Sequence, residues 1–312
     1  MDLATLIEAY LTHLQETGYS QATIQTNRDY MQYFRAFCIE RGITHPQRIE
    51  RPHIQRYQKY LFHYRQANGE PLSFDTQSRR LLGLKKFFSF LLEKGHLQKD
   101  PTFSLELPRK RKKLPTVLTL KEVEKILSHI DLTTPAGARD RALLELLFST
   151  GMSRKEIKSL NVQDIDLSEE LVTIRPCEER QGRTLPLTES AVLYLQNYIL
   201  EVRPHLLSLS GQGQEEDTLF LDSKAGEPLH TWTFGQIIRR AKKRVGIQKK
   251  GGFSLFRGTV ASLMIERGCD LRYVQEILGH KSPQTTRKFA RLSIQRLKEV
   301  HTKTHPASQE EK

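Results

Sequence analysis

The longest run of side chains with a clear chemical use consists of five consecutive basic residues: Arg109, Lys110, Arg111, Lys112 and Lys113. Guanidinium and ammonium groups bind phosphate oxygens through charge-assisted hydrogen bonds. Such a run can also be merely solvated or act as a localisation signal. Pro108 and Pro115 bracket it and stop a helix from crossing its ends, so the segment is typical of a domain linker. We favour a linker that crosses a DNA backbone, because it joins two basic halves.

A second basic group lies in segment 76–94, where the apolar residues Leu81, Leu84, Phe88 and Leu91 form one helical stripe. Four basic residues lie off this stripe or at its margin: Arg79, Arg80, Lys85 and Lys86. A face of this kind is either solvated or in contact with phosphate, and the pattern leaves both interpretations open.

The charge of the whole chain points to the same kind of partner. Lys and Arg number 49 against 36 Asp and Glu, which gives a net charge of +13. A globular chain this basic is typical of a protein with a polyanionic partner, and duplex DNA is the first candidate. A membrane surface is the competing polyanion, but no run of about 18 apolar residues is present, so we expect no membrane binding.

The cysteines indicate neither a disulfide framework nor a metal site. Cys38, Cys177 and Cys269 are few, scattered and without paired ligand spacing. We therefore expect no metal and no cofactor. The segment Met1 to Tyr10 carries acidic residues and no apolar signal core, which predicts a cytoplasmic, nucleoid-associated protein.

These residues must be positioned by two domains, since 312 residues exceed the roughly 250 to 300 that one core serves. The first part reads as helical throughout, with long helices expected over 20–41, before Gly42, and over 76–94, before Gly95. The expected boundaries are 1–106 for this domain, 107–116 for the linker and 117–312 for the second domain.

The second domain is expected to be helical around a small antiparallel sheet. It opens with a capping box, Thr119 with Glu122, and a helix to about residue 130. A longer helix over 138–150 stops at Gly151, and segments 171–174 and 184–187 read as a strand pair. The rest is helical, interrupted by a polar loop at 208–217. The fold class is mainly α with a small antiparallel β-sheet in the C-terminal domain.

Several segments, in order along the chain, resemble the tyrosine recombinases of the phage integrase family, particularly the Xer type. The matching segments are 139–152, 268–280 and 285–289, with a tail at 302–306 and a looser match near 20–24. The resemblance implies a two-domain clamp around duplex DNA. It also implies a tyrosine nucleophile, two phosphate-binding arginines, two histidine-type positions and a proton-donating lysine.

Most of those catalytic positions hold other residues in this chain. The first arginine position is Ser153, with Arg154 one residue later, and the lysine position is Cys177 or Glu178. The His-x-x-Arg box reads Ser254 to Arg257, so only its arginine is present. His280 matches the later histidine, and Phe289 stands at the nucleophile position.

The simpler interpretation of some of these residues is structural. Ser153 and Glu156 form their own capping box, and Gly279 is a natural helix cap beside His280. Arg175, Arg180 and Arg183 flank the strand pair and could touch phosphate, but arginine is a poor proton donor because it stays protonated.

The sequence thus favours a sequence-specific DNA-binding pseudo-recombinase, either a repressor or an architectural partner of an active recombinase. The alternatives are a divergent recombinase with relocated catalytic residues and a protein-only scaffold. The tail is expected to pack either on its own body or on a neighbour, which would be a second copy or a partner recombinase.

Overall fold

The computed structural model describes residues 1–108, 115–176, 181–210, 217–289 and 301–302. The chain divides into two compact units, residues 1–113 and 114–312. Most of the segment expected to be the linker lies outside the described residues.

The first unit is helical. Its elements are α1 (Leu3–Glu16), α2 (Gln21–Ile39), a short 3₁₀ helix η1 (Pro46–Arg48), α3 (Arg51–His63) and α4 (Phe74–Glu93). Ser20 caps α2 and Ser73 caps α4, because each side chain accepts a hydrogen bond from the backbone N–H three residues later. The two long helices expected here are confirmed, with ends shifted by one or two residues.

The core of this unit is rich in aromatic rings. Phe34 packs edge-on against Tyr57 with ring centroids 5.0 Å apart, and Phe87 packs in the same way against Tyr10 at 5.5 Å. Edge-to-face contacts of this kind add about 0.5–1.5 kcal/mol to the burial of each pair.

Helix α4 buries a wider arc than its apolar stripe predicts, because α1, α2 and α3 all pack against it. Arg80 lies within this arc and is only 8% exposed, with its guanidinium carbon 3.8 Å from the centroid of the Tyr33 ring. Arg80, expected to lie off the apolar stripe or at its margin, is therefore part of the buried face. Arg79 is exposed and pairs with Asp75 at 3.2 Å.

The second unit contains the remaining elements. Its helices are α5 (Leu120–Ser128), α6 (Pro135–Thr150), α7 (Arg154–Lys158), α8 (Glu189–Asn197), α9 (Arg203–Leu207), α10 (Thr231–Arg244), α11 (Phe253–Glu266), α12 (Leu271–Leu278) and α13 (Pro283–Arg287). Short 3₁₀ helices η2 (Val162–Asp164) and η4 (Ser208–Ser210) and a π-helical stretch η3 (Tyr198–Val202) link them.

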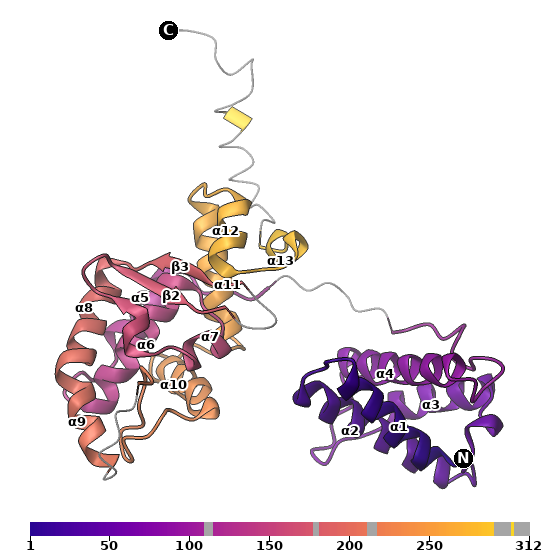
Figure 1. The fold of residues 1–312 in the computed structure, drawn as a ribbon. Helices are drawn as coiled ribbons and strands as arrows, with labels where there is room; N and C mark the ends of the chain where they lie inside the picture. The colour runs from indigo at the N-terminus through magenta and orange to yellow at the C-terminus, as the bar shows by residue number, and fades with distance from the viewer. Residues whose placement is uncertain (109–114, 177–180, 211–216, 290–300, 303–312) are drawn as a thin grey trace. The chain divides into compact units, whose positions relative to one another are not determined.

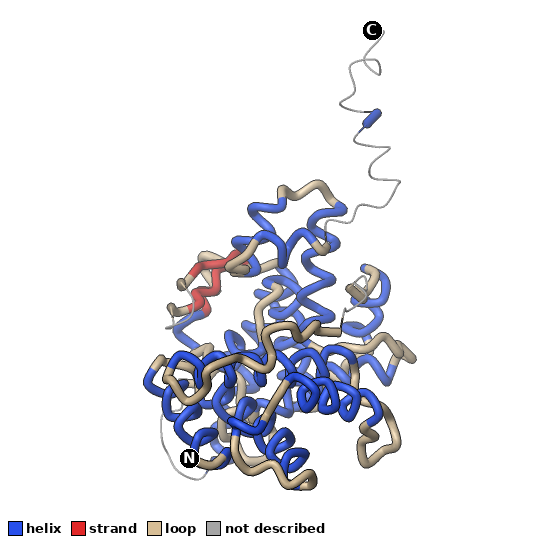
Figure 2. Tube along the Cα trace, turned by 90° about the vertical axis from the view of Figure 1, so that its right-hand side faces the viewer, coloured by secondary structure: helices blue, strands red, loops and turns tan. Residues whose placement is uncertain are grey.

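The sheet is small and antiparallel, in the order β1 (Ile165–Asp166), β2 (Leu171–Ile174) and β3 (Arg183–Pro186). Val172 pairs with Leu185, so both side chains face the core. Figure 2 shows these strands in red and the helices in blue. The expected fold class is confirmed, although β3 begins one residue earlier than predicted.

Helix α6 is the centre of the second unit, where Leu143, Leu144, Leu146 and Leu147 are fully buried. It packs against α5, α8 and α11 (Figure 1). It ends at Gly151, whose φ of +61° is the left-handed conformation that glycine adopts readily. This turn places the start of α7 beside α11 and the end of α12, where the candidate site lies.

Candidate functional site

Ser153 is a helix cap. Its hydroxyl accepts a hydrogen bond from the Glu156 backbone N–H at 3.4 Å, and the Glu156 carboxylate accepts one from the Ser153 N–H at 2.6 Å. This confirms the predicted capping box. The hydroxyl is thus occupied at the first turn of α7, and it brings no positive charge to the site.

Glu156 is buried and binds two arginines. Its carboxylate lies 2.8 Å from Nη1 of Arg183 and 3.7 Å from Nη1 of Arg257. Burial by itself raises the pKa of this carboxyl, but hydrogen bonds from Arg183 and from the Ser153 backbone outweigh it and lower the pKa to about 2. The carboxylate is therefore charged at neutral pH and compensates the nearby guanidinium charges.

Arg183 extends from the start of β3 into this cluster. Its Nε donates to the Ile277 carbonyl at 2.9 Å, and its side chain is only 11% exposed. The buried Nη2 has no hydrogen-bond partner in the described part of the chain. Arg183 thus ties the sheet to α7 and to the end of α12, and little of it is open to solvent.

Arg257 lies on α11 and joins the ends of two other helices. Its guanidinium donates to the Gly151 carbonyl at 2.9 Å and to the Leu278 carbonyl through a short bond. The side chain is 13% exposed. The one arginine that matches the family's box is therefore also a structural bridge between α6 and α12.

His280 follows the left-handed cap Gly279, whose φ is +62°. The Arg257 Nε donates to its Nε2 at 3.4 Å, and because arginine can only donate, this nitrogen must accept. The other ring nitrogen, Nδ1, lies 2.9 Å from the Thr286 hydroxyl. His280 is held between a guanidinium and a buried hydroxyl.

Phe289 packs as an apolar side chain. It lies against a small cluster formed by Ala261, Ile265, Val274 and Leu278. A Cβ built on Gly258, the residue after Arg257, would be 3.0 Å from the Phe289 ring. The ring thus comes close to α11 beside Arg257, at the place that the resemblance assigns to a nucleophile, and it carries no oxygen.

The other candidate residues divide into three groups. Ser254 and Arg154 line one basic cavity. Arg175 is half exposed and pairs with Asp164 at 2.7 Å. Arg109 to Lys113, Cys177, Glu178 and Arg180 lie outside the described residues.

Sequence reasoning missed the link between Glu156 and the two arginines, because the partners are far apart in the chain. It also missed the basic cavity, although the density of Lys and Arg over 239–250 was a visible signal. Among the described residues no group of three His, Cys, Asp or Glu could hold a metal ion. No helix of the described chain is long and apolar enough to cross a bilayer.

A helical first unit, joined to a unit that gathers positions 153, 254, 257, 280 and 289 around α11, defines the integrase class of proteins. The Phage integrase family model matches residues 116–296, and the N-terminal SAM-like domain of phage integrases matches residues 6–96. This chain belongs to the phage integrase family of tyrosine recombinases, as the resemblance implied.

Two curated relatives illustrate the similarity. "Tyrosine recombinase XerC 2" of Ralstonia nicotianae is 38% identical over 306 residues, which cover 98% of this chain and 86% of the relative. "Tyrosine recombinase XerD" of Listeria monocytogenes is 33% identical over 303 residues, which cover 96% of this chain and 98% of the relative.

Solved structures support the fold. A lambda integrase dimer bound to a COC' core site has a TM-score of 0.70 at 19% identity, and the match covers 93% of this chain and 95% of that one. The Tn1549 transposon integrase in complex with a circular intermediate DNA has a TM-score of 0.74 at 17% identity, covering 97% and 99%.

Proposed function

We propose that this protein binds duplex DNA sequence-specifically as a pseudo-recombinase, with both units contacting the duplex as a clamp, and that it does not cleave DNA. The net charge of +13 and the DNA-bound structural relatives support binding. The observation that carries the proposed loss of chemistry is Phe289, an apolar ring packed against α11 near Gly258, the residue after Arg257, at the position where a nucleophile would be needed.

The neighbouring positions strengthen this proposal. A phosphoryl-transfer transition state gains negative charge, and each preorganised donor that meets it contributes about 10²- to 10³-fold in rate. Ser153 and Ser254 supply no positive charge, and the charge of Arg257 is partly compensated by Glu156. Arg257 and His280 are left to hold a phosphate without completing the reaction.

A divergent recombinase with a relocated nucleophile is the main alternative, and both curated relatives are named as tyrosine recombinases. Within the candidate site, the hydroxyl of Thr286 lies 2.9 Å from Nδ1 of His280. Thr286 is only 1% exposed, however, so a DNA phosphate cannot approach it without local opening. This burial favours the non-catalytic role.

The biological role we propose is that of a repressor or an architectural partner of an active recombinase, in the cytoplasm at the nucleoid. We further propose that the tail at residues 302–306 contacts a neighbouring protomer or a partner recombinase on DNA. A chain ending at His301 should then bind a single site as the parent does but lose cooperative occupancy of paired sites. Unchanged cooperativity would mean that the tail packs on its own body.

The deciding experiment combines binding with a trap for covalent chemistry. The unmodified protein is expected to bind duplex DNA with a dissociation constant below about 1 μM at low salt. Specific protein–DNA complexes reach about 10⁻⁸ to 10⁻¹¹ M, so this limit allows for a DNA site that is not the preferred one. Incubated with a nicked suicide substrate that carries its genomic binding site, it should leave no adduct that survives boiling in detergent. An adduct on any hydroxyl residue would establish an active enzyme, and absence of binding at low salt would favour the protein-only scaffold.

A further inference from the structure

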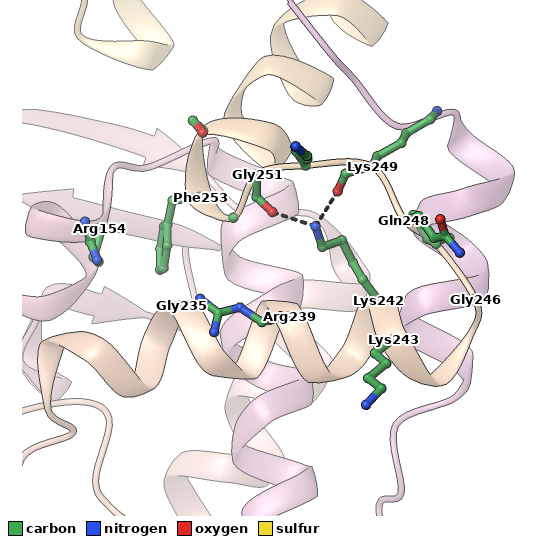
Figure 3. Close-up of a pocket in the computed structure, with 14 residues that line it drawn as sticks. Arg154, Gly235, Arg239, Lys242, Lys243, Gly246, Gln248, Lys249, Gly251 and Phe253 are labelled. Atoms are coloured by element: carbon green, nitrogen blue, oxygen red, sulfur yellow. Dashed lines mark hydrogen bonds between the residues drawn. The ribbon is translucent and has the colours of Figure 1, made fainter. Parts of the chain in front are cut away.

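A basic cavity of about 890 Å³ opens beside the candidate site in the second unit. Helix α10, the start of α7 and the loop 246–252 that leads into α11 line it (Figure 3). Six of its lining residues are basic: Arg154, Arg239, Lys242, Lys243, Lys249 and Lys250. The lining that the structure describes includes no Asp or Glu, so the cavity carries a positive potential that attracts an anion.

Lys242, on α10, is a buried residue of the cavity lining. It is only 6% exposed, and its Nζ donates to the carbonyls of Lys249 and Gly251, each at 2.6 Å. Both bonds are drawn in Figure 3. Burial, and the charge of Arg239 nearby, lower the pKa of Lys242. A buried ammonium held by two loop carbonyls fixes the loop and keeps those two oxygens turned toward itself.

The loop is also anchored at a second point. Lys249 donates to the Glu122 carboxylate at 2.6 Å and to the Val117 carbonyl at 2.9 Å. Gly251 has a φ of +125°, a backbone conformation that side chains with a Cβ rarely adopt. The path of the loop is therefore determined by two lysines and a glycine.

Three cations remain available for a ligand. Four lining cations, Arg154, Arg239, Lys243 and Lys250, are exposed, and in the described part of the chain their side chains make neither a hydrogen bond nor an ion pair. Figure 3 shows the Lys243 side chain pointing away from the loop, which leaves Arg154, Arg239 and Lys250. Figure 3 shows Phe253 between Arg154 and Arg239. Gly252 is the N-cap residue of α11. It has no side chain, so it makes no side-chain hydrogen bond to the backbone N–H groups at the N-terminus of this helix.

We propose that this cavity seats a backbone phosphate of the bound DNA, contacted by Arg154, Arg239 and Lys250, and that Lys242 is a positioning residue for the loop. The proposal rests on the proposed DNA binding and adds a specific contact to it. Several uncompensated cations, with no facing carboxylate, suit a phosphodiester that must give up its counterions. Because the bonds of Lys242 to the described part of the chain are to two loop carbonyls, it acts on the ligand through the loop.

The test compares Arg239→Gln with Arg240→Gln, which removes the same charge from the next residue of α10. Arg240 is exposed, outside the lining and 3.7 Å from Asp140. Arg239→Gln should weaken DNA binding about tenfold, as the loss of one charge-assisted contact does, and should reduce the slope of log affinity against log salt by about one. Arg240→Gln should change both by much less. Equal effects would overturn the proposal.

The role of Lys242 is tested with Lys242→Met and the double variant Lys242→Met/Arg239→Gln. If Lys242 acts through the loop, Lys242→Met weakens binding of the folded protein, and adding Arg239→Gln then weakens it less than in the parent. A lower melting temperature with unchanged affinity and salt slope would mean that Lys242 only stabilises the fold, which contradicts its positioning role.

Two further controls separate the remaining outcomes. In the first control, pyrophosphate is titrated into the parent without DNA. If pyrophosphate binds tightly, and Arg239→Gln abolishes this binding but leaves the affinity for DNA unchanged, the cavity binds a free phosphate ligand and the proposal is overturned. If the parent itself does not bind DNA, the proposed function fails. If the parent binds and Arg239→Gln binds equally well, only this inference fails.

Discussion

At the scale of single residues, the candidate site contains a buried carboxylate, that of Glu156. Glu156 caps the start of α7 and forms an ion pair with Arg183, and its carboxylate lies 3.7 Å from Nη1 of Arg257. Removing one partner of a buried ion pair is more costly than the pair itself is stabilising, because an uncompensated charge remains in the interior.

Glu156→Gln is therefore expected to destabilise the second unit by about 3–5 kcal/mol. Urea denaturation measures this change, with Glu169→Gln as the control because Glu169 is an exposed carboxylate. Equal stability of the two variants would show that the cluster contributes little.

The same carboxylate makes stability depend on pH. Its pKa is lowered from an ordinary 4.5 to about 2 in the folded protein, so its contribution is complete above 4.5 and is lost as the pH falls toward 2. A shift of this size corresponds to about 3 kcal/mol. Denaturation curves between pH 6 and 2 should show this loss of stability in the parent, and the loss should be smaller in Glu156→Gln, which has no carboxylate to protonate at this position.

Phe289→Tyr tests the chemistry at the residue scale. Restoring a phenol supplies a nucleophile, but Ser153 and Ser254 still leave the transition-state charge unmet, so we expect no covalent adduct with a nicked suicide substrate. The comparison is a variant that also carries Ser153→Arg, Cys177→Lys and Ser254→His, because such residues act as a unit. Cleavage by Phe289→Tyr alone would show that the remaining site is competent.

At the scale of elements, helix ends hold the site together. Gly151 ends α6, Gly279 ends α12, and Arg257 donates to carbonyls at both of these ends. A side chain at Gly279 would also meet the Arg183 guanidinium, with an ideal Cβ only 2.7 Å from Nη1. This turn therefore needs glycine for two reasons, its backbone conformation and the close approach of Arg183.

Gly279→Ala should destabilise the second unit by about 1–3 kcal/mol, the sum of left-handed strain and displacement of Arg183. Gly246→Ala is the matched control, since Gly246 has a φ of +75° and nothing within 4 Å of a built Cβ. Thermal denaturation of both variants separates the two causes. If the melting temperatures of the two variants fall equally, the close approach of Arg183 to Gly279 contributes nothing to the loss of stability.

At the scale of the whole molecule, the proposed binding depends on charge spread over two units and their linker. Replacing Arg109 to Lys113 by Gln should weaken DNA binding similarly for specific and non-specific sequences, and should flatten the salt dependence by roughly 0.9 for each lost phosphate contact. Fluorescence anisotropy at several salt concentrations measures both effects. The control variant, Lys110→Arg/Lys112→Arg/Lys113→Arg, retains the charge and should bind DNA as the parent does. Unchanged binding by the Gln variant would show that the segment connects the two units without contacting DNA.

The sequence by itself determined the features that depend on close neighbours in the chain. The capping box of Ser153 and Glu156, the helix stops at Gly151 and Gly279 and the strand pair around Val172 all follow from residues a few positions apart, and the structure confirms them. Side-chain burial was harder to predict, since the exposure of Arg80 depends on how many helices pack on α4.

Only the tertiary structure decided which charges meet. Arg183 and Glu156 are 27 residues apart, Arg257 and the Gly151 carbonyl 106 apart, and Lys249 and Glu122 127 apart. No local pattern encodes such pairs, because they form only when the packing of whole helices brings their side chains within a few ångströms. The same packing turned Lys242 inward to two carbonyls and left Arg239 outside, although a sequence pattern treats the two as equivalent basic residues of one helix.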